Sequence, residues 1–143
     1  MPGARPGLAL VVAFGSVLLA GCSEVTDVSA DVAEHAAVEH VEGSELSRLV
    51  LSAAARQRLD ISTDRVRSVD GLTVIPYAAV LYTADGATWT YVVDGPTGFL
   101  RHHIAIERIS GTQAGLSAGP PPGAHVVTVG AAELLGTELD VGH

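Results

Sequence analysis

Between Leu72 and Leu135 the chain repeats one pattern, in which short runs of β-branched and aromatic residues alternate with clusters of Gly, Pro and Asp. Such runs are typical of successive short strands. The runs cover residues 72–81, 88–93, 99–106 and 126–129. The pattern predicts a mainly β fold, and we expect a small antiparallel β-roll or barrel-like domain over residues 44–136.

The middle of this stretch reads as a hairpin. Pro76 cannot donate to a sheet, so it belongs at a strand start or an edge, and 77–82 is expected to be the next strand. In the run that follows, Trp89, Tyr91 and Val93 share one face of the pleat. The turn 94–98 then sends 99–106 back antiparallel, with the aromatic positions on the buried face.

Other segments complete the expected domain. Residues 47–51 read as a strand, and Ser52 is a good N-cap for one short helix over 53–59. The Gly- and Pro-rich stretch 115–123 is expected to be a loop before the last strand. Residues 130–136 should form a closing turn or short helix, and 137–143 a polar tail.

Composition excludes several classes of function. The chain has 143 residues, eight Arg, no Lys and a net charge of -8, so it can build one small core and lacks the clustered positive charge that nucleic acid requires. Cys22 is the only cysteine, which rules out an internal disulfide and a Cys-rich metal site. The sequence contains no Gly-x-Ser-x-Gly, phosphate-loop or His-Glu-x-x-His motif, so we expect no enzyme, nominate no catalytic residue and expect no cofactor.

The N-terminus predicts secretion. Leu8 to Leu19 is an uncharged apolar run that is too short to span a membrane but has the length of a signal-peptide core, so residues 1–21 are expected to be removed. The run ends in Leu19-Ala20-Gly21-Cys22, which resembles the lipobox of bacterial prolipoproteins. In that family the cysteine carries the lipid, which implies attachment through Cys22 to the extracytoplasmic face of the cell membrane. The alternative is an ordinary signal peptide followed by a chance cysteine.

Residues 22–43 have the composition of a lipid-anchored acidic tether. Acidic side chains are scattered among Ala, Val and Ser, with no aromatic residue to build a core. The histidines leave a metal-binding hypothesis open. His35 and Glu39 would share one face of a helix whereas His40 would not, and the adjacent His102 and His103 point to opposite faces of a strand. One of these two could join His125 if their strands are neighbours.

The order of motifs in the folded part resembles a known family. Ile75-Pro76, Ala79-Val80-Leu81, Tyr91-Val92-Val93, Val126-Val127-Thr128 and Gly130 follow one another as in the membrane-proximal β-roll of periplasmic adaptors, or membrane fusion proteins, of efflux pumps. Residues 49–63 are similar to the N-terminal stretch that contributes to the same domain. The gap from Thr63 to Leu72 is too short for the lipoyl-like, hairpin and barrel domains that full adaptors insert there.

The resemblance implies a lipid-anchored accessory subunit that docks on an inner-membrane efflux or ABC-type transporter. The role of opening an outer-membrane channel, which needs the hairpin, is not carried over. The alternative function is an envelope lipoprotein that binds Zn²⁺ or Cu²⁺ through its histidines, with His35, His102 and His125 as candidate ligands. The transported substance and the oligomeric state are left open by the sequence.

Overall fold

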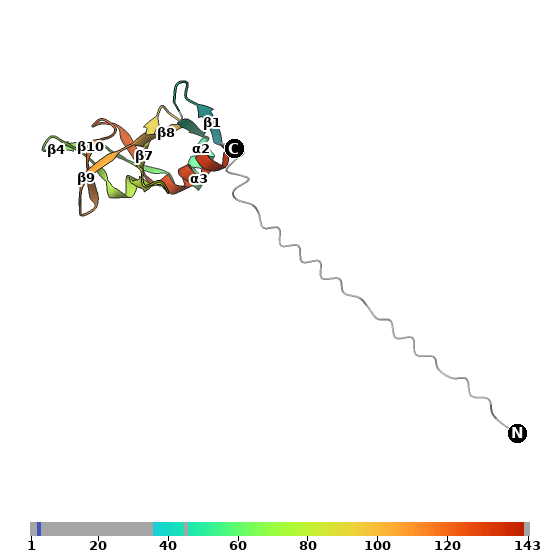
Figure 1. Ribbon diagram of the computed structural model, residues 1–143. Coiled ribbons are helices and arrows are strands. Elements are labelled where there is room, and N and C mark those ends of the chain that lie inside the picture. The colour runs from blue at the N-terminus through green and yellow to red at the C-terminus, as the bar shows by residue number, and fades with distance from the viewer. Residues whose placement is uncertain (1–2, 4–35, 45, 142–143) are drawn as a thin grey trace.

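The computed structural model describes residue 3, residues 36–44 and residues 46–141 (Figure 1). The expected signal peptide apart from Gly3, the lipid-attachment residue Cys22 and the candidate ligand His35 lie outside the described residues. The described part of the chain consists mainly of antiparallel strands, which confirms the predicted fold class.

Eleven strands, two α-helices and one 3₁₀ helix make up the described part of the chain. In chain order they are β1 (Ala36–His40), β2 (Ser47–Leu51), α2 (Ala53–Arg58), β3 (Ser62–Arg65), β4 (Arg67–Val69), β5 (Leu72–Pro76), η1 (Tyr77–Ala79), β6 (Leu81–Tyr82), β7 (Thr88–Asp94), β8 (Gly98–His103), β9 (Ala105–Ser110), β10 (Gln113–Ala118), β11 (His125–Val129) and α3 (Ala131–Val141).

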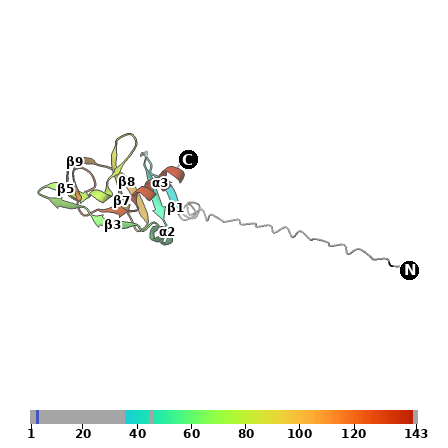
Figure 2. The same ribbon diagram turned by 90° about the horizontal axis from the view of Figure 1, so that it is seen from below.

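The strands form two sheets. The large sheet has the order β1-β2-β8-β7-β11-β3, with β6 added beside β7, and the small sheet has the order β4-β5-β10-β9. In the large sheet β2 pairs with β8 and β3 pairs with β11, so the early strands are joined both to the middle of the domain and to its last strand. Figures 1 and 2 show β1, α2 and α3 at one end of the molecule and the small sheet at the other.

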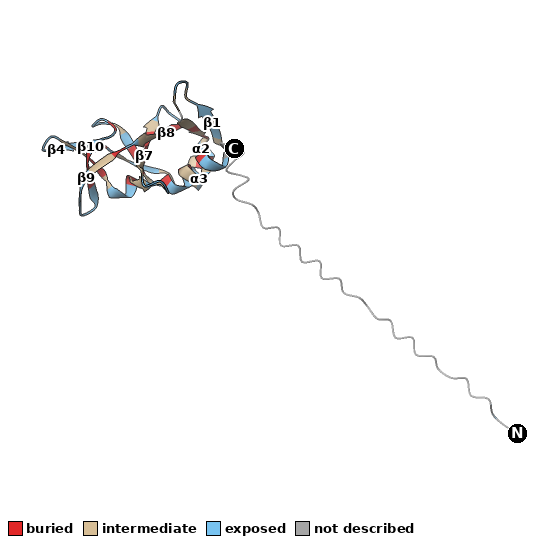
Figure 3. Ribbon diagram, in the orientation of Figure 1, coloured by how far each residue is buried: buried red, intermediate tan, exposed pale blue. Residues whose placement is uncertain are grey.

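The two faces of the large sheet bury two different cores. Tyr91 of β7 and Val127 of β11 pack with Phe99 under the helices, whereas their neighbours Val92 and Val126 pack toward the small sheet. This division follows from the alternation of side chains along a strand. In Figure 3 the buried segments lie along the middle strands and the exposed ones at the loops. The face of β7 that carries Thr90 and Val92 is therefore covered as well.

The helices follow the expected local signals. The Ser52 hydroxyl accepts a hydrogen bond of 3.1 Å from the Ala55 N–H, which confirms the predicted N-cap of α2. Between β11 and α3 the chain turns at Gly130, whose φ is 84°. A side chain there would meet Ile61 and lie 2.9 Å from the Leu59 carbonyl oxygen, so only glycine fits.

The folded part is longer at both ends than the sequence predicted. Residues 36–40, which we placed in the tether, form the edge strand β1. Arg48 of β2 holds this strand by an ion pair of 3.0 Å to Glu39, and it also bonds Asp94 at 2.6 Å. Residues 137–141, which we placed in the tail, continue α3. Glu138, in this last part of the helix, is buried.

Two predicted strands are interrupted. Pro76 ends β5, and the expected strand 77–82 opens with η1, closed by the bond from the Val80 N–H to the Tyr77 carbonyl. The expected strand 99–106 breaks at Ile104, which is fully buried where the chain passes from the large sheet to the small one.

The expected Gly- and Pro-rich loop begins too early. Residues 115–118 belong to the strand β10, which pairs with both β5 and β9. Position 115 of this strand requires glycine, because a side chain there would collide with Leu72 of β5 and lie 3.2 Å from Arg108 of β9. The glycine permits close approach of the neighbouring strands, so its expected place in a loop is wrong.

Candidate functional site

The structure separates the histidines that the sequence proposed as metal ligands. His102 and His103 lie on β8 and His125 on β11, and β7 stands between these two strands. The condition under which His102 or His103 could join His125, that their strands are neighbours, is therefore not met. The His103 ring packs edge-on against Trp89 at 5.1 Å between centroids, and His40 ends β1 on an exposed edge. Among the described residues no three His, Cys, Asp or Glu side chains are grouped to hold a metal ion.

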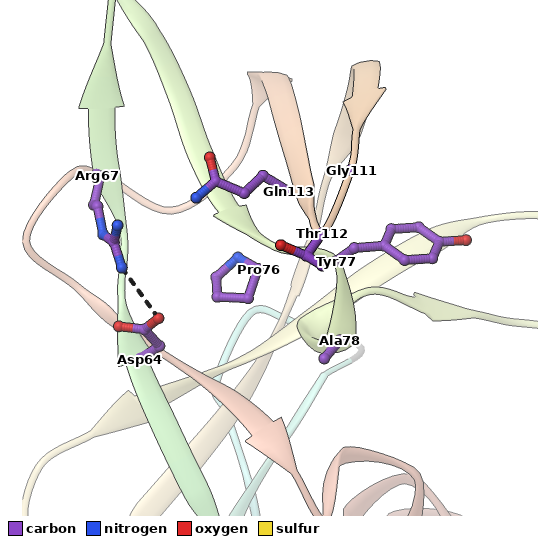
Figure 4. A pocket seen from close by; sticks show the side chains of 8 residues that line it. All are labelled: Asp64, Arg67, Pro76, Tyr77, Ala78, Gly111, Thr112 and Gln113. Carbon is purple, nitrogen blue, oxygen red and sulfur yellow. Dashed lines mark hydrogen bonds and ion pairs between the residues drawn. The ribbon is translucent and has the colours of Figure 1, made fainter.

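A first open pocket, of about 530 Å³, lies where η1 meets the small sheet (Figure 4). We call it the η1 pocket. Pro76 lies between the side chains of Arg67 and Gln113 on one side and Ala78 on the other, while Tyr77 points away. The lining residues are Asp64, Arg67, Pro76, Tyr77, Ala78, Gly111, Thr112 and Gln113.

The charges of the η1 pocket neutralise each other. Arg67 donates to Asp64 at 3.3 Å, and both side chains are well exposed. An exposed pair of this kind contributes little to stability or to binding. The remaining polar groups, from Thr112 and Gln113, are neutral, so the pocket offers hydrogen bonds but no net charge to a ligand.

Two tyrosines connect the η1 pocket to a second depression. The hydroxyls of Tyr77 and Tyr82 are 3.3 Å apart, and Tyr82 lines an open groove of about 480 Å³ between the β6–β7 loop and α3. We call it the α3 groove. Its lining consists of Tyr82, Thr83, Ala84, Asp85, Trp89, Arg101, Leu135 and Leu139.

The floor of the α3 groove is fixed by a network of buried and half-buried side chains. Arg101 binds Glu138 of α3 at 3.2 Å and lies over the Trp89 ring, 4.6 Å from its centroid. Tyr91 donates its hydroxyl proton to the same carboxylate. The Trp89 indole N–H donates to the Thr83 hydroxyl at 3.2 Å. The network fixes the position of α3 over the sheet and holds Trp89 in the groove.

Burial governs the ionisation of the tyrosine in this network. Desolvation raises the pKa of Tyr91, and the hydrogen bond to Glu138 raises it further. The phenol therefore stays protonated and acts as a donor to the carboxylate. Arg101 leaves its Nε atom buried without a hydrogen-bond partner among the described residues. Its guanidinium is engaged by Glu138 and by Trp89.

Asp85 carries the charge at the rim of the groove. Its carboxylate accepts hydrogen bonds from the Thr83 hydroxyl and, at 3.3 Å, from the Ala87 N–H. These bonds lower the pKa of Asp85, so it is ionised at neutral pH. The positive charge of Arg101 lowers the pKa of Asp85 further, and the carboxylate itself is exposed to solvent.

Sequence reasoning did not find the α3 groove. Its helical wall comes from Leu135 and Leu139, which the prediction divided between a closing turn and a polar tail. A signal was present, because Leu134, Leu135, Glu138 and Leu139 recur at helical spacing. The position of α3 against the β6–β7 loop, in contrast, depends on tertiary contacts.

Comparison with known proteins gives no match: no protein-family model, no curated protein and no solved structure is significantly similar to this chain. Among the described residues, no helix has both the length and the apolar character needed to cross a bilayer.

Proposed function

We propose that this chain is a lipid-anchored envelope protein that docks as an adaptor-like subunit on an integral transporter of the cytoplasmic membrane. The anchor is Cys22, at the end of the Leu-Ala-Gly-Cys motif. The folded domain acts through contact with its partner. The observation that carries the docking role is a strip of apolar and aromatic side chains on the surface of this domain.

We call this surface the tyrosine strip, and it consists of Tyr77, Tyr82, Trp89, Leu135 and Leu139. The exposed fractions are 39% for Tyr77, 55% for Tyr82 and 53% for Leu139. Large apolar side chains that gather on a small domain mark interaction surfaces, and Tyr and Trp are enriched in protein interfaces. The strip therefore suits a protein partner better than free solvent.

The connection to the lipid limits where docking can occur. Residues 22–35 separate the proposed anchor from the first residue of β1. A chain of this length spans at most about 50 Å when fully extended. The end of the domain that carries β1 and α3 must therefore stay within this distance of the bilayer, which matches a partner embedded in the same membrane.

Fractionation and partner capture test the proposal. Wild type is expected in the membrane fraction, whereas Cys22→Ala should lose the lipid and move to the soluble extracytoplasmic fraction. Crosslinking before detergent extraction should recover an integral transporter with the wild-type protein. Repeated recovery of the lipoprotein alone, or membrane retention of Cys22→Ala without its partner, would reject the proposal.

The alternative function, binding of Zn²⁺ or Cu²⁺, has no specific observation in its favour among the described residues, since β7 separates His102 from His125. Calorimetry with both ions measures it directly. A dissociation constant weaker than about 1 mM, close to -4 kcal/mol, would discard the alternative.

A further inference from the structure

We infer that the α3 groove is the specific receptor for the partner and that it takes a basic, apolar segment of that protein, with Arg or Lys beside a large aliphatic or aromatic residue. This inference rests on the proposed docking function and names the chemistry of the partner. It is carried by the shape, the exposed apolar surface and the charge of the groove.

The apolar half of the groove is built to receive a side chain. Leu135 and Leu139 from α3 line the groove together with Trp89 and Tyr82 from the sheet. The volume of about 480 Å³ lies within the range of sites that bury a ligand, which is about 300–1,000 Å³. Large aromatic and aliphatic anchors in such a site dominate the binding energy of protein interfaces.

The charge of the groove selects a cation. Arg101 is the only basic residue in the lining, and it is already bound to Glu138 and stacked on Trp89. Asp85 is ionised, and the nearby Arg101 acts on it electrostatically but forms its own ion pair with Glu138. The helix that forms the wall, α3, carries three acidic residues and contains no Arg or Lys. An approaching basic side chain thus finds a carboxylate whose one basic neighbour in the lining is already paired.

The same charge argues against other occupants. Residues 23–35 of this chain carry four acidic residues and no Arg or Lys, so they would be repelled by Asp85 and α3. Anionic lipid headgroups would be repelled for the same reason. A second copy would bring another acidic surface, since the chain has a net charge of -8. A basic segment of a different protein is the occupant that the charges favour.

The groove needs little rearrangement to bind. Its floor is fixed by the contacts of Arg101 with Glu138 and Trp89, and by the bond from Trp89 to Thr83. Asp85 is likewise held by Thr83 and Ala87. A preformed site loses little conformational entropy on binding, which favours affinity and specificity.

The only tryptophan of the chain reports occupancy directly. Trp89 lies in the groove, so its fluorescence should change when a segment binds, without any added label. The purified, detergent-solubilised full chain would be titrated with a synthetic peptide that alternates Leu and Arg. The control peptide has Glu in place of Arg. We expect a saturable change in Trp89 emission with the Arg peptide and none with the Glu peptide.

Three variants locate the binding. Asp85→Asn should weaken the Arg peptide about fivefold, the effect of losing one exposed ion pair. Leu139→Ala should weaken it about tenfold through lost apolar contact. Ile109→Ala is the matched control, because Ile109 is as exposed as Leu139 but lies on β9 of the small sheet. It should bind the peptide as wild type does.

Several outcomes would overturn the inference: no saturable change, equal binding of the Glu peptide, or equal weakening by Ile109→Ala. Vesicles of phosphatidylglycerol that alter Trp89 emission as strongly as the Arg peptide would also overturn it, in favour of a lipid surface.

Partner capture separates the two proposals. If Leu139→Ala still captures the transporter as wild type does, the groove is excluded while docking stands. If wild type captures no transporter but binds the Arg peptide, docking on a transporter is excluded while the groove chemistry stands.

Discussion

Gly130 lies directly after β11, beside Leu59 and Ile61 in the segment that follows α2. Its φ of 84° is a left-handed conformation, and a side chain there would collide with Ile61 and the Leu59 carbonyl. We expect Gly130→Ala to destabilise the protein by about 3 kcal/mol, the sum of the backbone penalty of 1–2 kcal/mol and the collision. Denaturant unfolding measures this.

Gly123 is the matched control for Gly130. Its φ is 96°, but a side chain there would meet nothing within 4 Å. Gly123→Ala should therefore cost only the backbone term, about 1–2 kcal/mol. Equal losses for the two variants would show that the contact with Ile61 is unimportant.

The buried phenol of Tyr91 predicts a pH dependence. Its pKa is raised by burial and by Glu138, so the folded state keeps a proton that the unfolded chain loses above about pH 10. This stabilisation is complete below pH 10 and decreases as the pH rises further, by up to about 1.4 kcal/mol per pH unit. Unfolding titrations between pH 8 and pH 11 should show the decline in wild type.

Two tyrosine variants test the assignment. Tyr91→Phe should be less stable at pH 8 but should lose most of the alkaline decline, because the buried phenolic proton is absent. Tyr82→Phe should keep most of the decline, since Tyr82 is exposed and only hydrogen-bonded to Tyr77. A decline that persists unchanged in Tyr91→Phe would contradict the linkage.

At the scale of single residues, the sequence indicated chemistry poorly. It proposed histidines as ligands, but whether they meet depends on strand order, and β7 lies between β8 and β11. Asp85 lies in the β6–β7 loop, and its place beside Trp89 and Leu139 in one groove comes from the packing of α3. Local patterns carry no information on which distant segments become neighbours.

Among the elements, α3 depends most on a single buried contact. Glu138 is 8% exposed and binds both Arg101 and Tyr91. Glu138→Ala would leave the guanidinium, 15% exposed, beside a cavity without its counter-charge. We expect a loss of about 3 kcal/mol in the free energy of unfolding.

Glu133 provides the comparison on the same helix. It is exposed, and its side chain makes none of the contacts of Glu138. Glu133→Ala should change stability by less than about 0.5 kcal/mol. If the two variants unfold at the same denaturant concentration, α3 is held by its apolar residues alone.

Strands with strong local signals were predicted well, and their interruptions were not. β2, α2, β7 and β11 agree with expectation to within about one residue, since β-branched runs and the Ser52 cap specify them locally. The break at Ile104 and the pairing of β1 with β2 could not be read from the sequence. Ile104 looks like any apolar strand residue, and in β1 Val38 is the one residue with a strong preference for strands.

On the scale of the whole molecule, the two cores should unfold together. β7 and β11 contribute side chains to both, such as Tyr91 and Val92 on adjacent positions. Leu134→Ala in one core and Ile104→Ala in the other should each cost about 3 kcal/mol and shift every probe by the same amount. Trp89 fluorescence and far-ultraviolet circular dichroism can be followed in one titration. Transitions that separate in either variant would show that the sheets unfold independently.

The Asp70-Gly71 turn between β4 and β5 lies at the opposite end of the molecule from β1 and α3 (Figure 1). In the lipid-anchored arrangement that we propose, a reporter protein fused behind α3 would lie on the side of the domain that faces the bilayer. An epitope inserted between Asp70 and Gly71 would in that arrangement face away from the lipid, and an antibody should reach it on intact spheroplasts.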